Sequence, residues 1–241
     1  MPINNHVSIV IPVHNEQSNI TCLLHEILQC FETLPFHLEI IIVDDGSSDA
    51  TYSILKALQQ KHDQLKIIRH KKNYGQSCAL LSGVKEAKYP IVVFIDGDGQ
   101  NNPADIPKLL DAIHSPHEIA FGVRINRHDN WHRRLSSRVA NAIRQCILKD
   151  NSKDTGCGLK VFPRQALLDL PHFNHFHRFL PALFSQNGFK IIQVPVSHRP
   201  RYFGQSHYGI WNRLFVGIYD LIGVYWLLRR NCHAELADDG Q

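Results

Sequence analysis

The stretch LEIIIVDDGSSDAT, residues 38–51, sets out the folding pattern of this chain. It opens with a continuous apolar run and passes through a turn of Asp, Gly and Ser residues to Asp49, a candidate helix N-cap. Ile54, Leu55 and Leu58 follow at helical spacing. The pattern predicts a buried strand, a polar turn and a helix in succession.

The same succession recurs on both sides of this stretch. Apolar runs predict strands over residues 7–13, 66–70 and 90–96, and apolar residues at helical spacing predict helices over 20–31 and 76–87. Continuous apolar strands that alternate with amphipathic helices are typical of a parallel sheet with helices on both faces. We therefore expect an α/β fold with a mostly parallel sheet.

The second half is less regular. Strands are expected over 118–124 and within 189–201, the latter running into a basic loop, and Leu135, Val139, Ile143 and Ile147 mark a helix. We expect one catalytic domain over 1–208, with a seam near residue 125 between a nucleotide half (1–125) and an acceptor half (126–208). Residues 209–241 form a C-terminal helix and tail.

The bulk composition is that of an ordinary globular protein. The chain has 241 residues, of which 44% are apolar and 20% charged, and a formal net charge of +4, so nothing calls for a nucleic-acid partner. The N-terminus lacks the basic start and long apolar core of a signal peptide, so we expect a cytoplasmic protein. Six cysteines without CxxC spacing predict reduced, mostly buried thiols rather than a disulfide or zinc framework.

Polar clusters follow each of the first four expected strands: HNE (14–16), DDGSSD (44–49), NYGQS (73–77) and DGDGQ (96–100). Ligands of parallel sheets bind beyond the carboxyl ends of the strands, so these clusters predict a single site. Asp96 and Asp98, two residues apart, are suited to Mg²⁺ or Mn²⁺, which take carboxylate oxygens together with substrate phosphates. The alternative is a turn in which Asp and Gly only satisfy the backbone geometry.

Four motifs resemble those of family 2 glycosyltransferases, which have the GT-A fold with a Rossmann-like sheet: IPVHNE, VDDGSSDAT, NYGQSCALLSG and FIDGDGQNNP. Three later motifs, RRLSSRVAN (133–141), DTGCGLKVFPR (154–164) and VPVSHRPRYFGQSHYG (194–209), are similar to those of polyprenyl-phosphate sugar transferases, typified by dolichol-phosphate mannosyltransferase. The resemblance covers about residues 6–210. It implies transfer of a sugar from a nucleotide to a lipid phosphate.

The resemblance also implies roles for particular residues. Those that would line or close the nucleoside pocket are Pro12, Asn15, Glu16, Asp44, Asp45, Gly75 and Gln76. The metal and diphosphate end would be Asp96, Asp98 and Gln100. Arg124, Arg133 and Ser137 would contact phosphate between donor and acceptor, Arg201 and Ser206 would clamp the pyrophosphate, and Arg178 would face the acceptor. We expect Asp98, Arg133, Arg201 and Asp154 to be the catalytic set, with Asp154 structural or orienting the lipid phosphate.

One position departs from the family pattern. The late loop usually reads Gly-x-Ser-Lys, whereas this chain has Gly204, Gln205, Ser206 and His207. Histidine is cationic only part of the time near pH 7, which puts the strength of this phosphate contact in doubt.

Two further features have alternative interpretations. HFNHFHRF (172–179) contains three histidines, which suits either a metal site or an amphipathic surface, and the absence of Asp and Glu companions favours the surface. Cys157, between two glycines, suits a small buried side chain better than a reactive thiol, because no partner base is identifiable.

The apolar stretch at residues 211–230 has the length of a membrane span but contains Arg213 and Asp220. These two residues fall with Gly217 on one narrow helical face, and the stretch ends in Arg229 and Arg230. The pattern favours an amphipathic helix lying in the headgroup region of a membrane. The alternative is a helix packed against the domain or against a second subunit, so the oligomeric state stays open.

Together these features predict a metal-dependent inverting glycosyltransferase at the cytoplasmic face of the membrane. It would move a hexose of the mannose or glucose type from GDP or UDP to dolichyl or undecaprenyl phosphate. Two alternatives are a transferase of the same fold acting on a sugar hydroxyl of a polysaccharide or lipid A precursor, and a non-catalytic nucleotide-sugar binding module.

Overall fold

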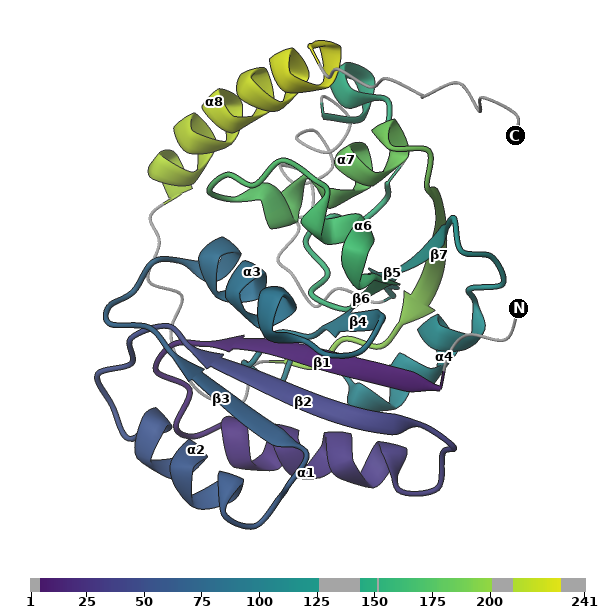
Figure 1. Cartoon of the computed structure of the whole chain (residues 1–241). Coiled ribbons are helices and arrows are strands. Elements are labelled where there is room, and N and C mark those ends of the chain that lie inside the picture. Colours follow the sequence, from purple (N-terminus) through teal and green to yellow (C-terminus); the bar gives the residue numbers. More distant parts are fainter. Residues whose placement is uncertain (1–4, 126–143, 151, 201–209, 231–241) are drawn as a thin grey trace, which may run out of the picture.

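The computed structural model describes residues 5–125, 144–150, 152–200 and 210–230, with the side chains of 210–216 excepted. Figure 1 shows a central sheet between two layers of helices. The sheet has seven strands in the order β3-β2-β1-β4-β6-β5-β7. The strands are β1 (His6–Val13), β2 (His37–Asp44), β3 (Leu65–Arg69), β4 (Ile91–Phe94), β5 (Glu118–Arg124), β6 (Lys160–Pro163) and β7 (Lys190–Val196).

The helices are α1 (Ile20–Phe31), α2 (Thr51–Gln59), α3 (Gln76–Glu86), α4 (Ile106–Asp111), α6 (Arg164–Leu168), α7 (Leu180–Gln186) and α8 (Ile210–Arg229). Two short 3-10 turns, η1 (Pro103–Asp105) and η2 (Phe176–Arg178), precede α4 and α7. Residues 144–148 are also helical. They are the described part of the helix expected around Ile143 and Ile147.

The first four strands are parallel, as expected from their continuous apolar sequences. β2 pairs with β1 and β3, and β1 pairs with β4, all in parallel register. Alternate residues of these strands enter two separate cores: Ile9 and Ile40 pack with α1 on one face, and Val10 and Ile41 pack with α3 on the other. The carboxyl ends of the four strands therefore open at one edge of the sheet.

β6 was not expected from the sequence. It lies between β4 and β5 and runs antiparallel to both, while β5 and β7 pair in parallel. Its four residues are too few to give a periodic signal, and it begins with a lysine. This strand brings the segment 154–160 beside the end of β4.

α8 lies on the outer side of the helical layer that contains α3, α6 and α7 (Figure 1). Val224 is buried against this layer, and Leu221, Leu227 and Leu228 pack partly against it. In the described part of the chain, no helix is long and apolar enough to cross a membrane.

The cysteines differ from the expectation in their burial. All five described cysteines are free thiols, but only Cys157 is buried, while Cys22, Cys78 and Cys146 are exposed. The prediction of mostly buried thiols was therefore wrong. The exposed cysteines occupy outward positions of helices, where a small side chain is not forced into the core.

Candidate active site

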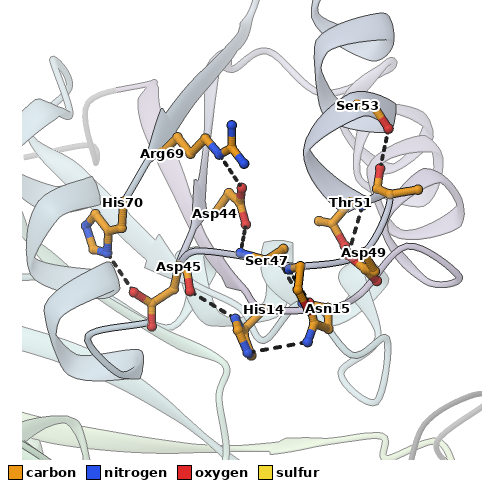
Figure 2. Close-up of polar contacts among 12 residues, drawn as sticks. His14, Asn15, Asp44, Asp45, Ser47, Asp49, Thr51, Ser53, Arg69 and His70 are labelled. Atoms are coloured by element: carbon orange, nitrogen blue, oxygen red, sulfur yellow. Dashed lines mark hydrogen bonds and ion pairs between the residues drawn. The ribbon is translucent and has the colours of Figure 1, made fainter. Parts of the chain in front are cut away.

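The loop after β1 is fastened to the loop after β2. Asn15 has a left-handed backbone (φ 57°), and its Oδ1 accepts a hydrogen bond from the Ser48 amide at 2.8 Å. The Asn15 amide donates to Ser47 Oγ at 2.9 Å, and His14 Nδ1 lies 2.9 Å from the carbonyl oxygen of Asp45. Figure 2 shows these side chains converging from the two loops. The sequence motifs HNE and DDGSSD thus form one surface.

Asp44 ends β2 and is fully buried. Its Oδ1 accepts a hydrogen bond from the Ser47 amide at 2.9 Å, and its Oδ2 lies 3.4 Å from Arg69 Nε (Figure 2). Among the described residues, no group donates a hydrogen bond to that Oδ2. A buried carboxylate oxygen without a donor is costly, so this atom is suited to accept a hydrogen bond from a ligand.

Asp45 holds the loop after β3. Its Oδ1 is 2.7 Å from His70 Nδ1 and 2.9 Å from the Tyr74 amide, and its Oδ2 accepts from the Gly75 amide at 2.7 Å. His70 also contacts Ser82 Oγ through Nε2. The carboxylate is thus occupied by the protein itself. The arrangement fixes the start of α3 beside the end of β2.

Asp96 follows β4 and receives a hydrogen bond from Gln76 Nε2 at 2.8 Å, so the loop after β3 also reaches the end of β4. Burial and the neighbouring charge of Asp98 raise the pKa of Asp96 to about 6, against the opposing effects of Lys160 and Arg124. Gly158 lies directly against this carboxylate. A Cβ atom at Gly158 would come within 2.1 Å of Asp96 Oδ2.

The loop that contains Asp98 and Gln100 is fixed to the chain after β7. Asp98 Oδ1 accepts from the Gln100 amide at 3.2 Å, and the Arg199 amide donates to the Gln100 carbonyl at 2.9 Å. The Arg199 guanidinium donates to both carboxylate oxygens of Glu26, so this basic residue is held by an ion pair within the protein.

Arg124 and Asp154 form a two-point ion pair beside Asp96. Arg124 donates to Asp154 Oδ2 through Nε at 2.7 Å and to Oδ1 through Nη2 at 2.8 Å. Asp154 is almost completely buried. Its carboxylate therefore orients Arg124, and the role expected for Asp154 in the reaction stays a prediction.

Lys160 is a charged residue of the site that the sequence analysis missed. It is buried, its Nζ donates to the carbonyl oxygen of Cys157, and its charge acts on Asp96. Burial lowers the pKa of Lys160, and the neighbouring Cys157, Asp96 and Asp154 oppose that effect. Its position within the motif DTGCGLKVFPR was the only signal that could have identified it.

The arrangement fits a divalent cation at Asp96 and Asp98. Burial and, after it, the nearby carboxylate of Asp98 raise the pKa of Asp96, and a cation between the two carboxylates would offset both effects. Gly158 leaves one side of the Asp96 carboxylate without a side chain. The described residues contain no group of three His, Cys, Asp or Glu side chains that could hold a metal, so Gln100, water or ligand phosphates would complete the coordination.

The three histidines of HFNHFHRF do not form a metal site in the described structure. His172 contacts the Leu167 carbonyl oxygen, His175 contacts Asp220, and His177 contacts Ser77. All three histidines therefore contact other groups of the protein, and Phe176 and Phe179 of the same stretch are buried, so the amphipathic-surface interpretation holds only for part of it.

The remaining expected site residues differ in how far the structure describes them. Pro12 and Glu16 are partly exposed near the loops after β1 and β2, and Arg178 is exposed in η2. The residues that lie outside the described part of the chain are Arg133, Ser137, Arg201, Ser206 and His207. Their expected roles remain predictions.

The profile of glycosyl transferase family 2 matches residues 8–170. The chain therefore belongs to this family, and the loops described above are the part of the fold that the profile covers. The alternation of strands and helices and the DGD motif are both within the matched range.

Curated relatives share more specific similarity. The chain is 33% identical over 217 residues to undecaprenyl-phosphate 4-deoxy-4-formamido-L-arabinose transferase from Edwardsiella ictaluri, and 35% identical to the protein of the same name from Sodalis glossinidius. Each match covers 90% of this chain and 66% of the relative. The chain thus spans about 66% of the length of these relatives.

Solved structures agree in fold. Glucosyl-3-phosphoglycerate synthase from Mycobacterium tuberculosis in complex with UDP matches with a TM-score of 0.66 at 17% identity, over 95% of this chain and 82% of that one. The complex of that enzyme with Mn²⁺, UDP-glucose and glycerol 3-phosphate matches with a TM-score of 0.66 at 18% identity, over 93% and 79%. The expected GT-A fold is confirmed.

Proposed function

We propose that this chain is an inverting glycosyltransferase that moves a sugar from a nucleotide diphosphate to a polyprenyl phosphate. The family assignment and the activity that the relatives' names describe support the reaction class. The observation that carries the proposal is the Asp96 and Asp98 pair at the end of β4, opposite Gly158 and tied to the neighbouring loop by Gln76.

The donor would bind along the edge formed by the loops after β1, β2 and β3. Asp44 Oδ2 would accept a hydrogen bond from the base, while Asp45 would keep Gly75 and Gln76 in place. Asp96, Asp98 and Gln100 would hold Mg²⁺ or Mn²⁺, and the structural neighbour has been solved in complex with each of these ions. The bound ion would neutralise the diphosphate and stabilise it as a leaving group.

The acceptor side supports a phosphate nucleophile. A sugar hydroxyl must lose a proton as it attacks, so it requires a positioned base, whereas a phosphate monoester is already mostly a dianion at pH 7. Asp154, a buried carboxylate that would otherwise be considered as such a base, accepts hydrogen bonds from Nε and Nη2 of Arg124. We therefore favour polyprenyl phosphate, with Arg133 and Arg201 as further phosphate contacts, over a hydroxyl acceptor.

We further propose that the reaction takes place at the cytoplasmic face of the membrane and that α8 contacts the lipid surface. The lipid-linked acceptor in the relatives' name and the exposed apolar residues of α8 support this attachment. Residues 1–208 would form the catalytic domain and 209–241 the membrane-contacting part.

The test measures transfer from a panel of nucleotide sugars, with and without undecaprenyl phosphate. The panel includes GDP-mannose, UDP-glucose and a nucleotide-linked 4-deoxy-4-formamido-L-arabinose, the sugar for which the relatives are named. We expect transfer that needs both the polyprenyl phosphate and a divalent ion. Transfer only to free sugar hydroxyls would contradict the proposal.

Asp98→Asn tests the metal assignment. We expect it to weaken Mn²⁺-dependent nucleotide binding at least tenfold in calorimetric titration, with little change in melting temperature. Asp111→Asn is the matched control, because Asp111 is an exposed residue at the end of α4. Tight, metal-independent nucleotide binding by Asp98→Asn would contradict the assignment of a metal to this site.

A further inference from the structure

The segment 174–177, between α6 and α7, contacts two helices that are distant in the sequence. Figure 1 shows the connection from α6 to α7 lying between α8 and α3. His177 is bound to α3 and His175 is bound to α8. We call residues 174–177 the histidine turn.

On one side, the histidine turn holds the start of α3. His177 Nδ1 and Ser77 Oγ share a hydrogen bond of 2.7 Å, and Ser77 is buried. Burial lowers the pKa of His177 to about 3, helped by the charges of Lys160, Arg178 and His175, so the ring is neutral and this contact is a hydrogen bond rather than an ion pair. Asn174 Oδ1 also lies against Gly75, 3.7 Å from where a Cβ atom would stand.

The start of α3 in turn positions the Gln76 side chain beside Asp96. Ser77 follows Gln76, whose Nε2 donates to Asp96 Oδ1 at 2.8 Å. Gln76 is exposed, so its own packing does not fix its position. The buried contact of Ser77 anchors the residue directly after Gln76, as Asp45 anchors Gly75 directly before it.

On the other side, the histidine turn holds α8. His175 Nδ1 lies 2.8 Å from Asp220 Oδ2, and both side chains are largely shielded from solvent. His175 has a left-handed backbone (φ 67°), which a residue other than glycine adopts only where its surroundings hold it. The one acidic residue in the described part of α8 therefore faces the domain and not the solvent.

We propose that His177 and Ser77 are positioning residues for the donor site and that the His175–Asp220 pair links them to α8. The seating of α8 then sets where Gln76 meets Asp96, and binding at Asp96 and docking of α8 are thermodynamically coupled. This inference rests on the proposed function, in which Asp96 binds the metal and diphosphate.

The competing explanation is that these contacts only stabilise the fold. In that case their removal lowers the melting temperature and leaves the affinity of the folded protein unchanged. Residues that do not share a contact are expected to have additive effects, so a coupling between α8 and α3 is a readout that a purely stabilising role does not produce.

The experiment measures binding of UDP, and in parallel GDP, with Mn²⁺ by calorimetry. We expect Ser77→Ala and His177→Leu to weaken binding about tenfold, and His177→Asn, which keeps a polar atom near the position of Nδ1, to restore most of it. His172→Leu is the matched control, since His172 contacts only the Leu167 carbonyl in its own segment. We expect this control to bind as the wild type does.

A double-mutant cycle tests the link to α8. Asp220→Asn is expected to weaken nucleotide binding about fivefold, and to have little additional effect in the Ser77→Ala background. Fully additive effects, or affinities that follow the melting temperature alone, would overturn the inference. If the wild type binds neither nucleotide with Mn²⁺, the proposed function fails; if it binds and the variants bind equally well, only this inference fails.

Discussion

The surroundings of Asp96 disfavour the ionised form of its carboxylate. The group is largely removed from water and lies near the charge of Asp98, and Gln76 donates a hydrogen bond to it. The charges of Lys160 and Arg124 offset part of the cost. A carboxylate held under these conditions would be stabilised by a bound cation, which is why we propose a metal at this position.

The substitution Asp96→Asn should make the energetic cost of ionising Asp96 in the folded protein measurable as a difference in stability. The pKa of Asp96 is raised from 3.8 to about 6, so between these pH values the folded protein keeps a proton that the unfolded chain has lost. Wild-type stability should therefore fall, relative to Asp96→Asn, as pH rises from about 4 to 6, and the difference should stay constant above 6. Each pKa unit corresponds to about 1.4 kcal/mol, so the difference approaches about 3 kcal/mol at most.

Urea unfolding of both proteins at pH 4.5, 6 and 7.5 checks this expectation. Mn²⁺ should raise the stability of the wild type at pH 7.5 and have little effect on Asp96→Asn. A stability difference that does not change with pH would show that Asp96 is ionised without cost.

Among the secondary-structure elements, the segment that leads into β6 contributes two residues to the surroundings of Asp96. It carries Gly158, which abuts the Asp96 carboxylate, and Lys160, whose charge reaches the same group. Because β6 lies beside β4 in antiparallel register, Phe94 is paired with Lys160 directly before the DGD loop. The position of β6 therefore decides the environment of Asp96.

Gly158→Ala tests this close approach. The added methyl group would meet Asp96 Oδ2 and Cγ, so the carboxylate must turn away from Gln76. We expect Mn²⁺-dependent nucleotide binding to weaken at least tenfold, with a small loss of stability because a side-chain end can move. The measurement is calorimetric titration alongside thermal unfolding.

Gly223→Ala is the matched control for that substitution. Gly223 lies within α8, and an added Cβ atom there meets nothing within 4 Å. It should leave binding unchanged and stabilise the helix by up to about 1 kcal/mol. Wild-type affinity in Gly158→Ala would argue that the Asp96 carboxylate is not confined by Gly158.

The same elements explain what could be predicted from the sequence. Runs such as LEIIIVD are long and continuously apolar, so β1 to β4 and the convergence of their loops were predictable. β6 has four residues and no periodicity, so it was not. The contact between Ser77 and His177 joins residues 100 positions apart, and no local pattern identifies such partners.

For the whole molecule, α8 is distinctive because apolar side chains lie on both of its faces: Val224 is buried against the domain, while other apolar residues are exposed. Asp220 faces the domain through His175, whereas Ile218, Tyr219, Ile222 and Trp226 are exposed to between 48% and 81%. Arg229 lies over the ring of Tyr225 at 4.5 Å, at the end of this exposed face. Exposed apolar side chains at helical spacing, flanked by arginine, are typical of a surface that meets lipid or another protein.

The double substitution Ile222→Ser and Trp226→Ser should separate these two partners. Burying an apolar side chain of this size contributes about 1.5 to 3 kcal/mol, so losing two such contacts should weaken binding to vesicles of phosphatidylcholine and phosphatidylglycerol more than tenfold. Binding should also weaken in 0.5 M salt, because Arg229 and Arg230 would contact anionic headgroups. Flotation of the protein with vesicles measures both effects.

Tyr74→Ser removes a comparably exposed aromatic residue from the loop after β3 and should leave vesicle binding unchanged. If the wild type ignores vesicles and sediments as a dimer that the double variant dissociates, the exposed face of α8 is a contact between two copies of the chain and the membrane assignment is wrong.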